Sequence, residues 1–393
     1  MAGPIPTMMY DQIAGFAEEF VALRRELHMH PELAFEEHRT SKLVAGELNR
    51  AGFGVTTGVA GTAVIGTLVR GNSHKVIGIR ADMDGLPIHE TTGLPYASRH
   101  AGKMHACGHD GHTTMLLGLA RYLSQSFNFD GTVHLFFQPA EEDISGAKRM
   151  VDEGVFRRFA CDQVFALHNI PGEAAGQILV RPGAITASID IVDVTIRGVG
   201  GHGAFPHQAF DPVVAAASAV MALQTAVSRN ADPLDPVAVT VGAIQGGSIA
   251  TAIPETVSLK IGVRTCSSAM HELMARRIPE LLKHQAASFG CVAEVRYGEG
   301  VVYPPCINDA EATALVRDVA LAMGQDRLKI DMAGPFMFSE DFSFMLDAVP
   351  GCYFGIGNGM SKNLHDSAYD FNDELVVKGT YFWASLVERF LKV

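Results

Sequence analysis

The sequence predicts an α/β fold with a mixed, mainly parallel sheet flanked by helices, into which a smaller α+β domain is inserted. Near-continuous apolar runs at 76–79 and 133–137 are typical of strands that are buried on both faces of a parallel sheet. Helical segments alternate with such strands up to about residue 185, which is the α/β pattern. At 189–197 apolar and polar residues alternate instead, and this is typical of a half-exposed antiparallel strand.

The first part of the chain is predicted to be helical. Apolar residues recur at helical spacing between 11 and 51, as Ile13, Phe16, Phe20 and Leu23 show. The α/β alternation that follows predicts strands at 62–70, 75–81, 133–137 and 164–167, and a helix at 113–123. Together these elements account for most of the larger of the two predicted domains.

The inserted domain is predicted from the order of its elements. Strands are expected at 189–197, 237–244, 256–264 and 292–297, with helices at 212–228 and 268–288. The order β-α-β-β-α-β is the signature of a ferredoxin-like unit. The α/β pattern resumes near residue 305 with a predicted helix at 310–323. We therefore expect an inserted domain at 186–298 between the two segments, 1–185 and 299–393, of one larger domain.

Composition narrows the class of protein. Of the 393 residues 48% are hydrophobic and 19% charged, so about two well-packed domains are expected rather than disorder. The net charge of -12 argues against nucleic acid or an anionic membrane as a partner. The first ten residues do not resemble a signal peptide, and no run of about 18 apolar residues predicts a membrane span. The six scattered cysteines indicate free thiols in a reducing cytoplasm.

The segment MHACGHDGH at 104–112 is the strongest indication of chemistry. It brings a thiol, three imidazoles and a carboxylate together directly before the predicted helix at 113–123. Cys107 and His109 are two residues apart, so a tight turn can direct both side chains at one metal ion. Two side chains do not complete a tetrahedral site, and further ligands are therefore needed from elsewhere in the chain.

Further ligand-type residues follow the predicted strands. These are Asp82 and Asp84 after 76–79, Glu141 and Glu142 after 133–137, His168 after 164–167, and His365 after the glycine-rich run 352–359. In open α/β sheets, ligands bind beyond the carboxyl ends of the strands. The repeated placement of such residues at strand ends predicts one metal site at this edge of the sheet.

Six motifs resemble those of a known family, in the same order. They are RADMD at 80–84, MHACGHDGH at 104–112, PAEE at 139–142, GGHGAFPH at 200–207, SEDF at 339–342 and LH at 364–365. The chain thus resembles the M20 metallopeptidases, and in particular their aminoacylase-like amidohydrolases, which include hippurate hydrolases and auxin-conjugate hydrolases. The resemblance extends from Arg25 to Asp373. It implies a zinc-exopeptidase-like catalytic domain and a satellite domain that mediates dimerisation.

The resemblance also implies roles for individual residues. Two divalent ions per subunit are expected, zinc or manganese, with cobalt and nickel as alternatives. The implied ligands are Cys107 as the bridge, His109 and His168 at one ion, and Glu142 and His365 at the other. Glu141 is implied as the general base, which takes a proton from the attacking water and returns it to the leaving amine. Asp84 is implied to orient a liganding histidine.

Two positions in the satellite domain are implied to act on the substrate. His202 lies between glycines and by resemblance reaches the active site of the partner subunit, where it stabilises the developing oxyanion. Arg264 is implied to bind the substrate carboxylate. Thr251 departs from the family pattern, in which an asparagine stands near that carboxylate. Carboxylate recognition by Arg264 and its neighbours, and amide or ester substrates, therefore stay open.

These features together predict a metal-dependent amidohydrolase that cleaves N-acyl or N-aroyl amino acids, with a cytoplasmic homodimer, or a higher homo-oligomer formed through the satellite domain, as the expected form. A dipeptidase and a hydrolase of larger amide-bearing natural products are alternatives on the same site. A cysteine hydrolase that uses Cys107 with His109, and a metal-binding protein without activity, are alternatives of another class. His28, His105 and His112 are predicted to be structural or to support the ligands. The sequence does not indicate the acyl group, the amino acid, its stereochemistry or the native metal.

Overall fold

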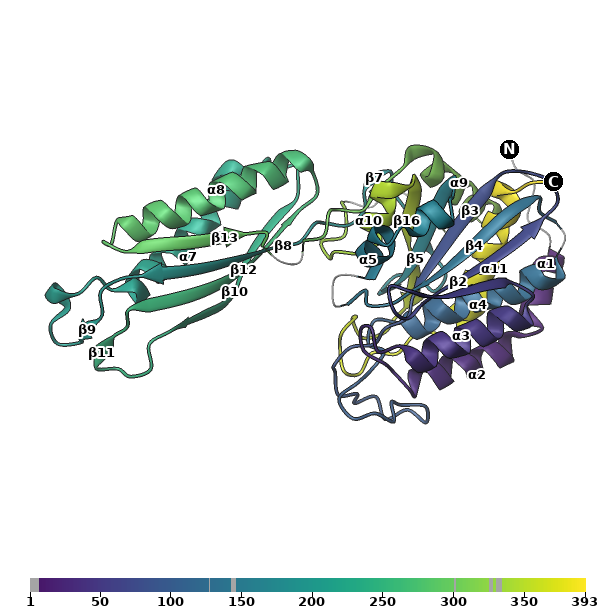
Figure 1. Cartoon of the computed structure of the whole chain (residues 1–393), viewed down its shortest axis with the longest axis horizontal. Coiled ribbons are helices and arrows are strands. Elements are labelled where there is room, and N and C mark those ends of the chain that lie inside the picture. Colours follow the sequence, from purple (N-terminus) through teal and green to yellow (C-terminus); the bar gives the residue numbers. More distant parts are fainter. Residues whose placement is uncertain (1–6, 127, 143–145, 300–301, 325–327, 330–333) are drawn as a thin grey trace. The chain divides into compact units, whose positions relative to one another are not determined.

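The chain forms two units in the computed structural model, which describes residues 7–126, 128–142, 146–299, 302–324, 328–329 and 334–393. Unit 1 comprises Met1–Gly183, Ile307–Ala333 and Asp341–Val393, and unit 2 comprises Ala184–Cys306 and Gly334–Glu340 (Figure 1). The predicted insertion at 186–298 lies within unit 2, which extends beyond it at both ends and includes one later segment. Each unit has a hydrophobic core of its own.

Unit 1 contains an eight-stranded sheet in the order β1-β2-β4-β3-β5-β16-β6-β15. The strands are β1 Gly54–Val59, β2 Ala63–Arg70, β3 Val76–Asp82, β4 Gly131–Gln138, β5 Gln163–Pro171, β6 Ile178–Leu179, β15 Leu328–Lys329 and β16 Gly351–Gly359. In its centre β3 is parallel to both β4 and β5, and β5 is parallel to β16. At one edge β1, β2 and β4 pair antiparallel. The sheet is thus mixed and mainly parallel, as predicted.

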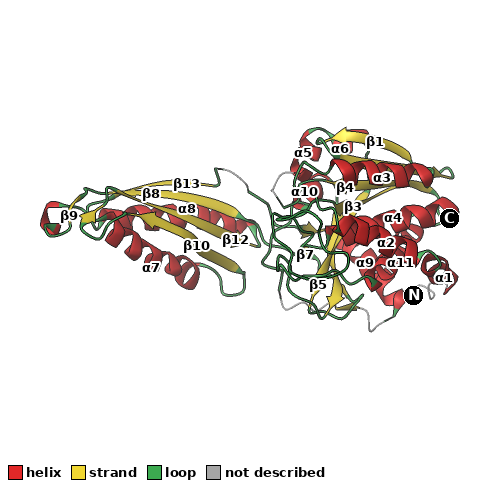
Figure 2. Cartoon of the chain, turned by 90° about the horizontal axis from the view of Figure 1, so that it is seen from below, coloured by secondary structure: helices red, strands yellow, loops and turns green. Residues whose placement is uncertain are grey.

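Helices cover both faces of this sheet (Figure 2). They are α1 Thr7–Ala14, α2 Ala17–His28, α3 His38–Arg50, α4 His109–Gln125, α5 Gly146–Asp152, α6 Val155–Arg158, α9 Ala310–Met323, α10 Ser343–Ala348 and α11 Glu374–Phe390. Ile77 and Ile79 of β3 face the core formed with α4 and α11. Phe136 of β4 points to the other face, where its ring packs against that of Phe156 in α6. This alternation explains why both faces of β3 and β4 are apolar.

Three details differ from the prediction for unit 1. The expected helix at 11–51 is interrupted between α2 and α3, where Pro31 cannot donate a backbone hydrogen bond. Strand β1 was not predicted, because its sequence GVTTGV has few apolar residues at an exposed edge. Strand β5 continues to Pro171, so that His168 lies within the strand and pairs with Gly355 of β16. The parallel ladder with β16 therefore extends the strand past its apolar run.

Unit 2 has the predicted α+β architecture. Its elements are β8 Asp190–Arg197, β9 Gly201–His202, η1 Pro206–Gln208, α7 Pro212–Asn230, β10 Val237–Gly246, β11 Ala252–Ile253, β12 Thr256–Thr265, α8 Ser268–Ala287 and β13 Val292–Tyr297. An antiparallel sheet in the order β10-β12-β8-β13 packs against α7 and α8, as in a ferredoxin-like fold (Figure 1). The caps of Asp211 and Ser267 begin the two helices. Two further short strands are β7 Gly183–Ala184 and β14 Ile307–Asn308.

A membrane-spanning helix needs about 20 predominantly apolar residues. No helix in the described part of the chain is both long enough and apolar enough to meet this requirement.

Candidate metal centre

The turn before α4 carries two of the predicted ligands. Cys107 and His109 flank Gly108, whose φ is 91°. A Cβ atom at Gly108 would lie 2.4 Å from the side-chain oxygen of Asn169 and 2.9 Å from the hydroxyl of Tyr369. Only glycine therefore fits this left-handed, closely packed turn. Both flanking side chains are buried, and His109 becomes the first residue of α4.

Ligand atoms of Cys107, His109 and His168 all lie within 4.8 Å of one another. The sulfur of Cys107 is 3.3 Å from Nε2 of His168. Nδ1 of His168 donates to the backbone oxygen of Asn169 at 2.8 Å, which leaves the Nε2 lone pair directed at the thiol. Sulfur and nitrogen ligands on one tetrahedral zinc ion are separated by about 3.5 Å. The group thus has the spacing that a common ion requires.

A second group contains Cys107, Glu142 and His365, again with ligand atoms within 4.8 Å of one another. Nε2 of His365 lies 3.2 Å from Oε1 of Glu142. His365 belongs to the loop after β16, has a positive φ of 65°, and donates its backbone N–H to Ala106 at 2.9 Å. This bond anchors the loop to the turn that carries Cys107. The sulfur of Cys107 is therefore shared by both groups.

Asp84 connects the two groups from just beyond the end of β3. Nδ1 of His109 lies 3.1 Å from one carboxylate oxygen of Asp84, and the backbone N–H of Glu142 donates to the other oxygen at 2.9 Å. Nε2 of His109 is buried and has no hydrogen-bond partner among the described residues. It lies 4.0 Å from Oε2 of Glu141 and 3.9 Å from Oε1 of Glu142. A buried histidine nitrogen that has no hydrogen-bond partner and lies close to two carboxylates is well placed to bind a metal ion.

The charges of the cluster also favour a cation. Burial alone would lower the pKa of His109, but Asp82 and Asp84 raise this pKa to about 10. Burial raises the pKa of the Cys107 thiol, and the Glu142 carboxylate raises it further. Both shifts reflect an excess of negative groups around these two side chains. A divalent cation would compensate this excess and would favour the thiolate form of the cysteine.

Asn169 was not predicted to take part in the cluster, whereas Asp82 was predicted as a ligand-type residue and His112 as a structural or supporting one. Nδ1 of His112 donates to Asp82 at 2.6 Å, and its Nε2 lies 2.6 Å from the side-chain oxygen of Asn169. The ring of His112 packs against that of His168 with centroids 4.6 Å apart. Asp82 was found from its position at a strand end. Asn169 has no comparable sequence signal, because its contacts come from the packing of β5 against α4.

Asp82 is itself held by a buried arginine. Arg80 donates to Asp82 at 2.7 Å, to Asp341 at 3.0 Å and to the side-chain oxygen of Gln138 at 2.8 Å. Burial alone would raise the pKa of Asp82, but His109, His112 and Arg80 hold it well below its usual range. These neighbours thus keep the carboxylate of Asp82 ionised although it is buried away from solvent.

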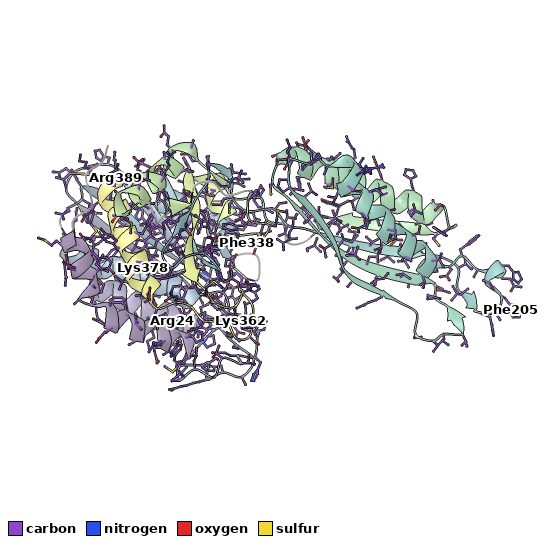
Figure 3. All side chains as sticks on the ribbon, turned by 180° about the vertical axis from the view of Figure 1, so that it is seen from behind. Arg24, Phe205, Phe338, Lys362, Lys378 and Arg389 are labelled. Carbon is purple, nitrogen blue, oxygen red and sulfur yellow. The ribbon has the colours of Figure 1, made fainter. Side chains whose placement is uncertain are left out.

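A second buried network lies on the other side of the turn. Nε of Arg24, a residue labelled in Figure 3, is 2.9 Å from Asp110, and Nδ1 of His28 donates to the same carboxylate at 2.8 Å. Arg24 also binds Asp370 at 2.7 Å, in the loop that carries His365. Burial opposes the charge on His28, but Asp110 raises the pKa of His28 to about 9. The network therefore ties α2 to both ligand-bearing segments.

The two predicted substrate residues, His202 and Arg264, belong to unit 2, whereas the five predicted ligands belong to unit 1. His202 is exposed in β9, where its Nδ1 accepts from the backbone N–H of Ala204 at 3.1 Å. Its ring lies beside that of Phe205, which is also exposed and is labelled in Figure 3. Pairing of β9 with β11 places His202 opposite Ala252. The loop thus presents both rings at the surface of unit 2.

Arg264 is engaged within unit 2. Its Nη1 donates to the hydroxyl of Ser339 at 2.7 Å and to the backbone oxygen of Met337 at 3.1 Å. Burial lowers the pKa of Arg264 from its ordinary value, although a guanidinium stays charged at any physiological pH. Thr251 accepts the backbone N–H of Gly203 with its carbonyl oxygen at 2.8 Å, which fixes the loop that carries His202.

The fold and the cluster define a class of protein. A mainly parallel sheet ends in two groups of thiol, imidazole and carboxylate side chains that share one sulfur, and Glu141 stands beside them. Such an arrangement is typical of a metal-dependent hydrolase that acts on linear amides.

Comparison with known proteins identifies the family within this class. Residues 78–389 match peptidase family M20/M25/M40, and the chain belongs to this family. It is 39% identical over 382 residues to a hippurate hydrolase of Campylobacter jejuni, which covers 97% of this chain and 99% of the relative. It is 36% identical over 375 residues to an N-acetyl-L-cysteine deacetylase of Bacillus subtilis, covering 95% and 88%. A dinuclear metal-binding peptidase of the M20 family from Bacillus subtilis superposes with a TM-score of 0.84 at 29% identity, covering 96% and 99%.

Proposed function

We propose that the protein hydrolyses the amide bond of N-acyl or N-aroyl amino acids to a carboxylic acid and a free amino acid. The observation that carries this proposal is the sulfur of Cys107, which belongs to two ligand groups beside Glu141 and Glu142. The relatives named for hippurate and N-acetyl-L-cysteine support the substrate class, since both names denote amides of an amino-acid nitrogen. A small N-acyl amino acid is therefore the proposed substrate.

Two divalent ions are proposed to occupy the cluster, one with His109 and His168 and the other with Glu142 and His365, with Cys107 between them. The dinuclear relative supports two ions, and the mixed sulfur, nitrogen and oxygen ligands suit zinc or manganese, with cobalt or nickel as alternatives. Bound ions would polarise the amide carbonyl and lower the pKa of a water molecule towards about 7. Asp84 holds His109 and the backbone of Glu142 in the orientation that this requires.

Glu141 is proposed as the general base. Its carboxylate lies 4.0 Å from Nε2 of His109, next to the two ligand groups. The neighbouring Glu142 is the proposed ligand, which leaves the role of base to Glu141. From this position Glu141 can accept a proton from the attacking water and donate it to the leaving amine, a role typically worth about 10²–10⁴-fold in rate. The cysteine-hydrolase alternative is disfavoured, because burial raises the pKa of Cys107 whereas a nucleophilic thiol needs a lowered one.

Unit 2 is proposed to mediate a homodimer and to supply His202 to the partner subunit as an oxyanion donor. The exposed apolar side chains of Val213, Val214 and Met221 on α7 support an interface there, as does β10, an edge strand. Arg264 is proposed to bind the substrate carboxylate. Its bonds to Ser339 and Met337 would then be exchanged for bonds to the substrate.

The cytoplasm is the proposed location. All six cysteines are free thiols, and Cys107 has to remain reduced to serve as a ligand. A dipeptidase activity, or activity on larger amide-bearing natural products, is the alternative on the same site.

The proposal is tested with metal analysis and a panel of N-acyl amino acids, N-aroyl amino acids and free dipeptides. We expect about two ions per chain, hydrolysis that is lost on chelation, and recovery with one divalent metal. Glu141→Gln should keep both ions and lose about 10²–10⁴-fold in kcat. Full turnover by this variant would refute the role of Glu141, and activity confined to free dipeptides would favour the alternative. Metal binding without activity on any member of the panel would favour a non-catalytic protein.

A further inference from the structure

The backbone on either side of Glu141 is held by two buried carboxylates. On one side the N–H of Glu142 donates to Asp84 at 2.9 Å. On the other side the N–H of Ala140 donates to Oε1 of Glu37, also at 2.9 Å. Glu37 is completely buried, although it comes from a segment of the chain that supplies none of the predicted ligands. The amide before the proposed general base is thus anchored as firmly as the amide after it.

The anchored residue has an unusual conformation. Ala140 has a φ of 54°, in the left-handed region that is unfavourable for a residue with a Cβ atom. Its carbonyl oxygen accepts from the N–H of Gly146 at 3.1 Å. This residue turns the chain sharply between the end of β4 and the two glutamates. The orientation of Glu141 and Glu142 therefore depends on what keeps Ala140 left-handed.

Glu37 is itself held in place for this contact. Its Oε1 also accepts the N–H of Phe35 at 3.0 Å, and its Oε2 accepts the hydroxyl of Thr62 at 2.6 Å. Glu37 stands at the start of α3 but makes no capping hydrogen bond to that helix. Glu32 does so instead, because its two oxygens accept the N–H groups of Arg39 and Thr40 at 2.9 and 2.8 Å. Helix capping therefore does not explain Glu37.

We propose that Glu37 is a positioning residue for hydrolysis, in that its Oε1 holds Ala140 in the left-handed conformation that orients the general base Glu141 and the ligand Glu142. The inference rests on the roles proposed for these two glutamates. Glu37 acts through the backbone and does not touch the substrate. It would thus couple the α2–α3 connection of unit 1 to the reaction.

The test compares Glu37→Ala with Glu37→Gln and with the matched control Glu32→Ala. The control removes two backbone hydrogen bonds from the same helical region without touching Ala140. We expect Glu37→Ala to lower kcat by about 10–100-fold with KM within about 3-fold, because small displacements of a catalytic group cost rate rather than binding. Glu37→Gln should retain most of the activity, since its Oε1 can accept both backbone N–H groups and its amide can donate to Thr62.

Two further readouts separate positioning from a loss of stability. Glu37→Ala should weaken the binding of one of the two ions by about 10-fold or more, whereas Glu32→Ala should bind both normally at a comparable loss of melting temperature. Ala140→Gly should reduce the kcat penalty of Glu37→Ala, because glycine adopts a positive φ without support. If Glu37→Ala does not fold, Glu37→Asp takes its place, since it withdraws the carboxylate by one methylene.

The inference is overturned if Glu37→Ala and Glu32→Ala have the same kcat and the same metal affinities. It is also overturned if Glu37→Gln folds but is as damaged as Glu37→Ala, because the charge would then matter rather than the acceptor. A wild-type protein that is inactive on the whole panel counts against the proposed function. In that case an unchanged metal affinity of Glu37→Ala still counts against the role of Glu37.

Discussion

Cys107 in unit 1 and His202 in unit 2 lie in contrasting surroundings. Cys107 is buried in a turn between β3 and α4, among side chains that are each held by a second contact. His202 is exposed on a strand of two residues, and its contacts with Ala204 and Phe205 lie within its own loop. The turn of unit 1 therefore fixes the position of the Cys107 thiol. The loop of unit 2, in contrast, leaves the His202 imidazole exposed and able to contact a substrate or another subunit.

This contrast separates two kinds of effect. Removal of a proposed buried ligand in unit 1 should change what the protein binds, because the other proposed ligands lie around it. Removal of the exposed imidazole of His202 should change the rate alone, because its contacts with Ala204 and Phe205 lie within its own loop. Metal content and kcat, measured on the same variants, therefore distinguish the two units.

The largest effect is expected from Cys107→Ala. This variant removes the sulfur that both ligand groups share, so metal content should fall well below that of the wild type and kcat should fall by about 10³-fold or more. Cys161→Ala, which alters a thiol outside these groups, is the control and should keep both ions. Two tightly bound ions in Cys107→Ala would show that the two groups do not share this ligand.

The variant His202→Ala tests the role of the exposed imidazole of unit 2. We expect kcat to fall by about 10²–10³-fold, the cost of one oxyanion donor, with metal content and melting temperature unchanged. His207, an exposed histidine of the same loop, provides the control variant His207→Ala. Equal activity of the two variants would exclude His202 from the reaction.

Asp84→Asn should have an intermediate effect within unit 1. The amide can replace one carboxylate oxygen but cannot accept at both, so either His109 or the N–H of Glu142 loses its partner. We expect metal affinity, measured by competition with a chelator, to fall by about 10–100-fold. Loss of a residue that orients a metal ligand has an effect of roughly this size in other metal sites. Asp130→Asn is the control, since Asp130 accepts two backbone N–H groups in a loop without ligands. Equal affinities would contradict the proposed role of Asp84.

The smallest effect concerns His134 in β4, a buried histidine of unit 1 outside the cluster. Burial lowers the pKa of His134 to about 4, against about 6.5 in the unfolded chain. Between these values the unfolded state binds more protons, so stability is retained above pH 6.5 and lost as the pH falls towards 4. The loss is on the order of 3 kcal/mol at most. His134→Gln should lose less stability over this range in denaturant titrations, and identical pH profiles would contradict the assignment.

Much of the ligand arrangement follows from local sequence. Asp84 and the pair Glu141 and Glu142 come directly after apolar runs, and the sheet brings the ends of β3 and β4 together. The β-α-β-β-α-β order likewise predicted unit 2, because each of its elements has a clear period of its own. Helix α9 and strand β13 occupy the residues that their patterns predicted.

The supporting contacts could not be predicted in this way. The bond of Glu37 to Ala140, and that of Arg80 to Asp341, join segments that are distant in sequence and show no periodic pattern. Strand β5 extended past its apolar run because β16 pairs with it, and this too depends on a distant segment. The roles of His202 and Arg264 stay predictions, because their function depends on groups beyond unit 2.

The position of β16 in the sheet has a consequence for folding. This strand lies between β5 and β6, yet it is synthesised after the whole of unit 2 and is followed by the loop that carries His365. The strands of unit 2 are all synthesised before β16, so the sheet of unit 2 has its partners before the sheet of unit 1 has all of its own. The sheet must wait for β16, and it closes through long-range contacts that are intrinsically slow to form. Because the loop that carries His365 follows β16, the second proposed ligand group is completed last, and we expect tight binding of two ions only in the fully folded chain.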